Sequence, residues 1–194
     1  MYHFKNSVRP FKIGPDFIDP LFHQKICQTP SVNLDTSIMN EDQVKWLFDK
    51  YSDKNISILE GVMGFYDGMD KNASAYDVTK LLNIPTIIVL DASGSYITLS
   101  ALIKGLKSYR DGNTIKGVIF NHVGSNSHFE LIKNQVEKDF DDVEVLGWIQ
   151  NRIDALDSTH LGLDLKDNQI EKLEIISKEV LKHIDLEKLE KIAF

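Results

Sequence analysis

Four carboxylates stand just after two aliphatic runs of this sequence, each close to a glycine or a proline: Asp16, Asp19, Glu60 and Asp67. If both runs are strands of one parallel sheet, their carboxyl ends meet at a crevice, where such sheets bind ligands. A hard divalent cation such as Mg²⁺ commonly takes one or two protein carboxylates together with phosphate oxygens and water. Any one of these residues would equally suit a helix cap or a solvated turn. Their joint placement favours a metal and phosphate site.

Two further polar side chains end aliphatic runs. Lys12, close to Gly14, offers a positive charge to a phosphate or a substrate carboxylate. A solvated surface lysine is the alternative. Asn121 ends another run, and its amide can pair with a purine edge or form a turn.

The histidines and the single cysteine offer less. His23, His122 and His160 lack metal-ligand spacing, and no serine or cysteine nucleophile stands beside them. We interpret them as surface or boundary residues. Cys27 is the only cysteine, which excludes an internal disulfide and a thiolate metal cluster. It lies in a segment expected to be helical, so we interpret it as a partly buried small apolar residue rather than a nucleophile.

Short aliphatic runs alternate with segments of helical period, which indicates βαβ units. The expected strands are Val8–Ile13, Ile56–Leu59, Thr86–Leu90, Val118–Phe120 and Val145–Ile149. Apolar residues at helical spacing predict helices over residues 41–51, 97–106, 129–136 and 170–184, and Asp185 is the expected N-cap of a last short helix. The runs are continuous rather than alternating, as in strands covered on both faces. The sequence therefore predicts an α/β fold with a doubly wound, mostly parallel sheet.

Length and composition limit the classes of protein. The 194 residues suit one α/β domain with a buried core. A formal net charge of −7, with basic and acidic residues interspersed, argues against a nucleic-acid partner. We find no apolar run long enough to span a bilayer and no signal-peptide core, so we expect no membrane partner and a cytoplasmic location.

Two segments carry a specific resemblance. Residues 10–20 read PFKIGPDFIDP and residues 60–68 read EGVMGFYDG. Both resemble the diagnostic motifs of the cobyrinic acid a,c-diamide synthase family, which are glutamine-dependent amidotransferases with a dethiobiotin synthetase-like domain. The resemblance continues through residues 30–35, 81–85, 121–125 and 159–163 and covers about residues 8–165.

The resemblance implies ATP-dependent amidation of the a- and c-acetate carboxylates of a cobyrinic-type tetrapyrrole, as in cobalamin biosynthesis. ATP would phosphorylate the carboxylate, and ammonia from glutamine would displace the phosphate. By this resemblance Asp16 and Glu60 help to hold Mg²⁺, Asp19 and Asp67 act on the substrate or on its phosphorylated form, and Asn121 recognises adenine. Positioning and charge neutralisation are what phosphoryl transfer requires.

The sequence departs from the family in three ways. None of its 11 glycines is followed by lysine, so the family's phosphate-binding loop and first strand are absent, and Met1 to Asn6 would be a remnant of the next helix. The C-terminal glutaminase domain has no counterpart. Val32, His122 and Thr159 stand where the family commonly has arginine.

We therefore expect residues 1–194 to be a partial synthetase domain that binds ATP weakly and forms no amide by itself, with ammonia supplied by a glutaminase domain outside this chain. A homodimer is compatible with this reading. Two alternatives remain: a non-catalytic binding or assembly module with the same fold, and an ATPase switch of the septum-site or partition type. The switch class lacks the motifs around Asp16 and Glu60.

Overall fold

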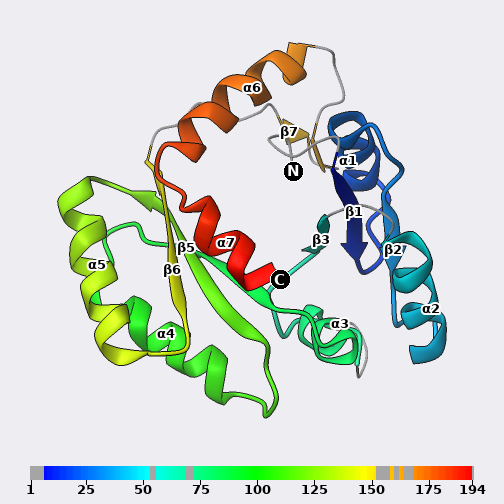
Figure 1. Ribbon diagram of the computed structural model, residues 1–194, viewed down its shortest axis with the longest axis horizontal. Helices are drawn as coiled ribbons and strands as arrows, with labels where there is room; N and C mark the ends of the chain where they lie inside the picture. Colours follow the sequence, from blue (N-terminus) through cyan, green and yellow to red (C-terminus); the bar gives the residue numbers. More distant parts are fainter. Residues whose placement is uncertain are drawn as a thin grey trace. The chain divides into compact units, whose positions relative to one another are not determined.

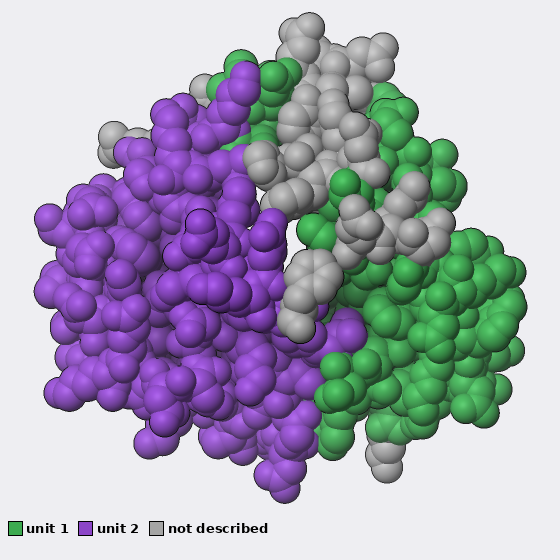
Figure 2. Space-filling view, viewed as in Figure 1, with its two compact units in different colours: residues 1–83, 155–177 green, residues 84–154, 178–194 purple. Residues whose placement is uncertain are grey.

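The computed structural model describes residues 7–52, 56–68, 72–151, 158–159, 162–163 and 168–193. The chain forms two compact units (Figure 2), the first from residues 1–83 and 155–177 and the second from residues 84–154 and 178–194. Each unit has its own three-stranded parallel sheet with helices packed against it, which confirms the α/β class. The described helices include none with the length and apolar character needed to cross a membrane.

The sheet of the first unit is built around a fully buried central strand. In spatial order its strands are β2 (Val32–Leu34), β1 (Val8–Ile13) and β3 (Ile56–Gly61). All six residues of β1 are buried, as expected for a strand with neighbours on both edges and helices on both faces. The register places Lys12 opposite Asn33 on one side and Glu60 on the other.

Helices cover both faces of this sheet (Figure 1). They are α1 (Asp19–Cys27), α2 (Glu41–Tyr51) and α3 (Ala75–Leu82), and α6 (Asn168–Leu181) begins in this unit. A short antiparallel pair, β7 (Ser158–Thr159) and β8 (Gly162–Leu163), also belongs to it. One apolar cluster, which includes residues of α2 and α3, contains Phe11, Ile13, Leu34, Val44 and Val78. A second cluster, which includes residues of α1, contains Val8, Phe22, Ile26 and Cys27.

The second unit has the strand order β4-β5-β6. Its elements are β4 (Thr86–Asp91), α4 (Ile97–Ser108), β5 (Ile115–Val123), α5 (Asn126–Asp139), β6 (Glu144–Gln150) and α7 (Leu186–Ala193), together with the end of α6. Helices α4 and α5 lie beside each other on one face of the sheet, and α7 lies on the other (Figure 1). The buried residues of its core include Ile103, Val118, Phe120, Ile132, Val136 and Leu146.

The segment after α6 packs tightly against β6. Trp148 is only 5% exposed and its ring stacks on those of Phe129 and His183, with centroids 5.9 and 4.2 Å away. Gly147 has φ +138, and a Cβ added there would clash with the carbonyl oxygen of His183. Only glycine adopts such a backbone conformation without strain while allowing another chain segment so close.

The expected strands and helices are confirmed, with longer bounds for four of the five strands. Asp185 caps the last helix as predicted, because its Oδ1 accepts a hydrogen bond from the backbone N–H of Lys188 at 3.0 Å. Sequence analysis missed β2, which has only three residues, and α3, which begins at a capping box between Ser74 and Asp77. Met1 to Asn6 and His160 lie outside the described residues.

Substitution of Gly147 by alanine should lower the free energy of unfolding by about 2 kcal/mol or more, because the new Cβ meets His183 backbone at a strained φ. Urea unfolding followed by circular dichroism measures the change. Gly105→Ala is the matched control: nothing lies within 4 Å of the added Cβ, and alanine in a helix should raise stability by about 0.5–1 kcal/mol. Equal effects of the two substitutions would contradict this account of Gly147.

Candidate active site

The carboxyl ends of β1 and β3 lie side by side, as the carboxylates in the sequence predict. Lys12 pairs in register with Glu60, and Ile13 with Gly61. Because neighbouring residues in a parallel register point to the same face, the side chains of Lys12 and Glu60 meet on the α1 side of the sheet. The site therefore begins with a lysine and a glutamate on adjacent strands.

Lys12 is the centre of this site. Its side chain is 2% exposed, and its Nζ lies 2.8 Å from Asp19 Oδ2, 3.2 Å from Asp16 Oδ2 and 3.5 Å from Glu60 Oε2. The alternative of a solvated surface lysine is thus wrong. The ammonium is engaged with carboxylates of its own chain, and three of the four predicted acids are brought together around it.

The loop between β1 and α1 delivers two of these acids. Gly14 has φ +96, which lets the chain turn away from the sheet. Asp16 Oδ1 then accepts hydrogen bonds from the backbone N–H groups of Ile18 at 2.9 Å and Asp19 at 3.2 Å, so the turn is closed by a side chain. Asp19 follows as the first residue of α1 and faces Lys12.

The surroundings of Lys12, Glu60 and Asp16 favour the charged form of each side chain. Burial lowers the pKa of Lys12, but hydrogen bonding to Asp19 and the charge of Glu60 outweigh it, so the pKa lies above the usual 10.5. Burial raises the pKa of Glu60, and the hydrogen bond with His23 and the charge of Lys12 more than compensate, bringing it below 4.5. The pKa of Asp16 is also below its usual 3.8, because the backbone N–H groups of Ile18 and Asp19 outweigh its partial burial.

His23 is a member of the site that sequence analysis missed. It is 4% exposed rather than at the surface or boundary, and its Nε2 lies 2.5 Å from Glu60 Oε2. Its Nδ1 lies 3.3 Å from the hydroxyl oxygen of Ser31. The sequence contained one signal that His23 could belong to the site: it follows Asp19 by four residues in a segment expected to be helical, so the two side chains share one face of the helix.

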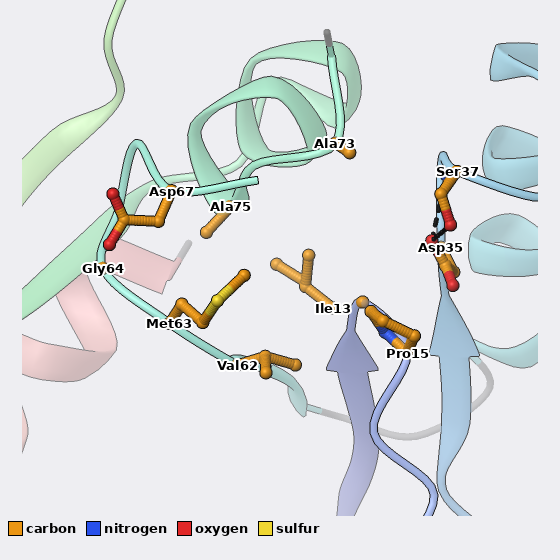
Figure 3. Close-up of a pocket in the computed structure, with 11 residues that line it drawn as sticks. Ile13, Pro15, Asp35, Ser37, Val62, Met63, Gly64, Asp67, Ala73 and Ala75 are labelled. Carbon is orange, nitrogen blue, oxygen red and sulfur yellow. Dashed lines mark hydrogen bonds between the residues drawn. The ribbon is translucent and has the colours of Figure 1, made fainter. Parts of the chain in front are cut away.

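Asp67 lies in the loop after β3 and lines a small cavity of about 30 Å³. Its backbone N–H donates to Gly64 O at 2.9 Å, and Figure 3 shows its carboxylate turned away from Ile13. Across the cavity, Asp35 accepts hydrogen bonds from the backbone N–H and the hydroxyl of Ser37 (Figure 3). The described residues give Asp67 no ion pair with Lys12, so this predicted acid stands apart from the cluster.

Asn121 belongs to the second unit, at the end of β5. Its Oδ1 accepts a hydrogen bond from the backbone N–H of His122 at 2.9 Å, and His122 has the left-handed φ of 58. His122 Nδ1 lies 3.1 Å from Asp91 Oδ2. The hydroxyl and backbone N–H of Ser93, followed by His122, lower the pKa of Asp91 to about 2. Polar groups thus gather at the carboxyl ends of β4 and β5.

Two further expectations concern metal and thiol chemistry. Among the described residues, no group of three or more His, Cys, Asp or Glu side chains is arranged as a metal site, whereas Mg²⁺ commonly takes only one or two protein carboxylates together with phosphate oxygens and water. Cys27 is 1% exposed, more buried than expected, and burial raises the pKa of its thiol. A buried thiol of this kind is unsuited to act as a nucleophile.

Comparison with known proteins identifies the family of this chain. Residues 26–158 match the family model described as an AAA domain. The chain is 41% identical over 194 residues to the cobyrinate a,c-diamide synthase of Saccharolobus solfataricus, a match that covers 97% of this chain and 44% of the relative. The chain is also 43% identical over 197 residues to the protein of the same name from Fusobacterium nucleatum, and this match covers 97% of this chain and 44% of the relative. No solved structure gives a significant match.

The chain thus belongs to the family described as an AAA domain. Within that class, it is a member of the cobyrinate a,c-diamide synthase family. It spans less than half the length of the curated relatives that it matches.

Lys12→Met should lower the free energy of unfolding at neutral pH by about 1.5–3 kcal/mol, because the carboxylates lose a charged hydrogen-bond partner. The lowered pKa values of Glu60 and Asp16 stabilise the fold above about pH 4.5, and this contribution is lost as the pH falls through them. Without Lys12 those pKa values rise towards their ordinary values, so the variant is less stable than the parent at neutral pH but loses less stability on acidification, and the two free energies of unfolding converge at low pH. Urea unfolding between pH 3 and 7 tests this.

The control for this substitution is Lys107→Met, which removes an ammonium 2.7 Å from a half-exposed carboxylate, Asp142, in the second unit. A surface pair contributes at most about 1 kcal/mol. If both variants follow the same pH profile, the cluster around Lys12 has no special electrostatic role.

Proposed function

We propose that this chain provides the carboxylate-activating part of an ATP-dependent synthetase that amidates the a- and c-acetate carboxylates of a cobyrinic-type tetrapyrrole. The observation that carries the proposal is the cluster of Asp16, Asp19 and Glu60 around Lys12, in segments that match synthases of this name. The carboxyl edge of a parallel sheet is the usual place for such a site.

The reaction would have two steps. The γ-phosphoryl group of ATP passes to an oxygen of the substrate carboxylate, which releases ADP. Ammonia then forms the new C–N bond, and inorganic phosphate leaves with its bonding electrons. Both steps require negative charge to be neutralised and reactants to be positioned.

The side chains of the cluster have suitable chemistry for these steps. Asp16 and Glu60 are the proposed Mg²⁺ ligands, and their oxygens suit a hard cation. The described contacts of Glu60 all reach Oε2, so Oε1 remains available to a ligand. Bound Mg²⁺ would neutralise phosphate charge. Lys12 contributes a fixed positive charge beside Asp19, and Asp19 and Asp67 would orient the substrate or its phosphorylated form.

Other parts of the proposal lie outside this cluster. Asn121 is the proposed adenine contact, and its amide nitrogen is a donor of the type a purine edge accepts. The sequence contains no Gly-Lys phosphate loop, so we expect weak ATP binding by these 194 residues and no amide formation. Ammonia would come from glutamine at a glutaminase domain, and a homodimer is compatible with this scheme. We propose a cytoplasmic location.

Isothermal titration of the chain with ATP and Mg²⁺ should give a dissociation constant in the millimolar range. The backbone N–H groups and the lysine of a phosphate loop normally cradle the phosphates, and this sequence has no such Gly-Lys loop. Incubation with a cobyrinic-type tetrapyrrole, ATP, Mg²⁺ and ammonia should give no amide by mass spectrometry. Micromolar ATP binding or amide formation would refute this expectation. A non-catalytic module would likewise form no amide here, so a longer protein is needed to separate the two.

In a protein extended to the length of the relatives, Glu60→Gln should reduce amide formation by about 100-fold or more, since it removes a charge without changing volume. The control is Glu130→Gln, an exposed glutamate on α5, which should retain full activity. ADP and amide are measured together. In the unsubstituted extended protein, ATP turnover without amide would favour the ATPase switch, and no turnover at all would favour the non-catalytic module. Full activity of the Glu60→Gln variant would exclude a metal role for Glu60.

A further inference from the structure

A buried histidine connects the cluster to the interior of the first unit. His23 is 5% exposed at its side chain and lies between Ser31 and Glu60. Its Nε2 is 2.5 Å from Glu60 Oε2, and its Nδ1 is 3.3 Å from Ser31 Oγ. If Nε2 carries the hydrogen, it donates to the carboxylate, while Nδ1 accepts from the hydroxyl of Ser31. Both ring nitrogens then have a partner.

Helix α1 fixes this histidine in place. Asp19 begins the helix and His23 follows one turn later, so one face reaches both Lys12 and Glu60. The neighbouring Phe22 belongs to the apolar cluster with Val8, which anchors the helix to the sheet. The imidazole therefore has little freedom to move.

Glu60 itself has much more freedom than its partner. Its side chain is 46% exposed and it stands next to Gly61 at the end of β3. Within the part of the chain that the structure describes, His23 and Lys12 are its polar contacts, and both reach Oε2. A half-exposed glutamate without such contacts would sample several rotamers.

We propose that His23 is a positioning residue that holds Oε2 of Glu60 and so leaves Oε1 oriented for a divalent cation. The inference rests on the proposed function, because it takes Glu60 as a metal ligand. Partners of this kind orient metal ligands, and their loss commonly costs 10–100-fold in affinity.

The order Ser31, His23, Glu60 also resembles a nucleophilic triad. Three observations favour positioning. The serine is 3.3 Å from the ring, the carboxylate is shared with Lys12, and the imidazole is almost completely buried. A general base must reach the proton that it abstracts and then deliver it to a leaving group. The labelling experiment on Ser31 described below tests whether this serine is instead a nucleophile.

The first measurement is Mn²⁺ binding to the 194-residue chain by electron paramagnetic resonance, with Mn²⁺ as the probe for Mg²⁺. Glu60→Gln should weaken binding by about 10-fold or more. His23→Asn should weaken Mn²⁺ binding by about 10-fold, because the asparagine amide reaches only the position of Nδ1 and cannot donate to Glu60. His23→Gln, which places a donor near the Nε2 position, should remain within about 3-fold of the parent chain.

The control is His128→Asn in the second unit, where His128 Nε2 lies 2.7 Å from the carbonyl oxygen of Ser95. It should leave Mn²⁺ binding unchanged. If Glu60→Gln binds as well as the parent, the metal role of Glu60 fails and the inference fails with it. If Glu60→Gln is impaired while His23→Asn is not, the inference alone is overturned.

A second measurement needs no variant and so does not depend on folding of a mutant. Nitrogen-15 chemical shifts of the imidazole should show His23 with hydrogen on Nε2 and a hydrogen bond to the carboxylate. An unprotonated Nε2 would overturn the proposal, because it could not donate to Glu60.

A third measurement tests whether Ser31 is a nucleophile. Labelling of Ser31 by a fluorophosphonate probe, lost in the Ser31→Ala variant, would overturn the proposal in favour of a nucleophilic serine.

Discussion

The first unit is organised around one electrostatic requirement, which is that a buried ammonium group must be surrounded by negative charge. Lys12 lies in the central strand, where every residue is buried, and an unpaired cation there would be very costly. The loop after β1 therefore turns at Gly14 and returns two aspartates to the lysine. The β1–β3 register adds Glu60 from the neighbouring strand. Fold and site thus depend on the same ion pairs.

Much of this arrangement could be predicted from residue type and order alone. Strand β1 was predicted with its observed bounds, although Arg9 and Lys12 interrupt its apolar residues. Acidic residues next to glycine and proline indicated where these strands end. The three-residue β2 escaped prediction because it is too short to show a period, and α3 was missed although Ser74 and Asp77 form a capping box at its start.

The environment of single side chains was harder to predict. His23 and Glu60 are 37 residues apart, and only the packing of α1 on the sheet brings them into contact. Lys12 was expected to offer its charge to a ligand, whereas the structure shows that charge already balanced within the chain. Lys12 and Glu60 were recognised from the sequence as candidate site residues and His23 was not, because their partners are fixed by tertiary contacts that local sequence does not encode.

The stacked Trp148 has a consequence for spectroscopy. The chain has two tryptophans, one in each unit: Trp148 is 5% exposed between two rings, and Trp46 on α2 is 58% exposed. A buried indole emits at shorter wavelength than a solvated one, so the two units have distinguishable intrinsic fluorescence. Loosening of the segment around His183 would shift the short-wavelength emission of Trp148 to longer wavelength and leave the emission of Trp46 unchanged. The protein therefore contains its own pair of optical reporters, one for each sheet.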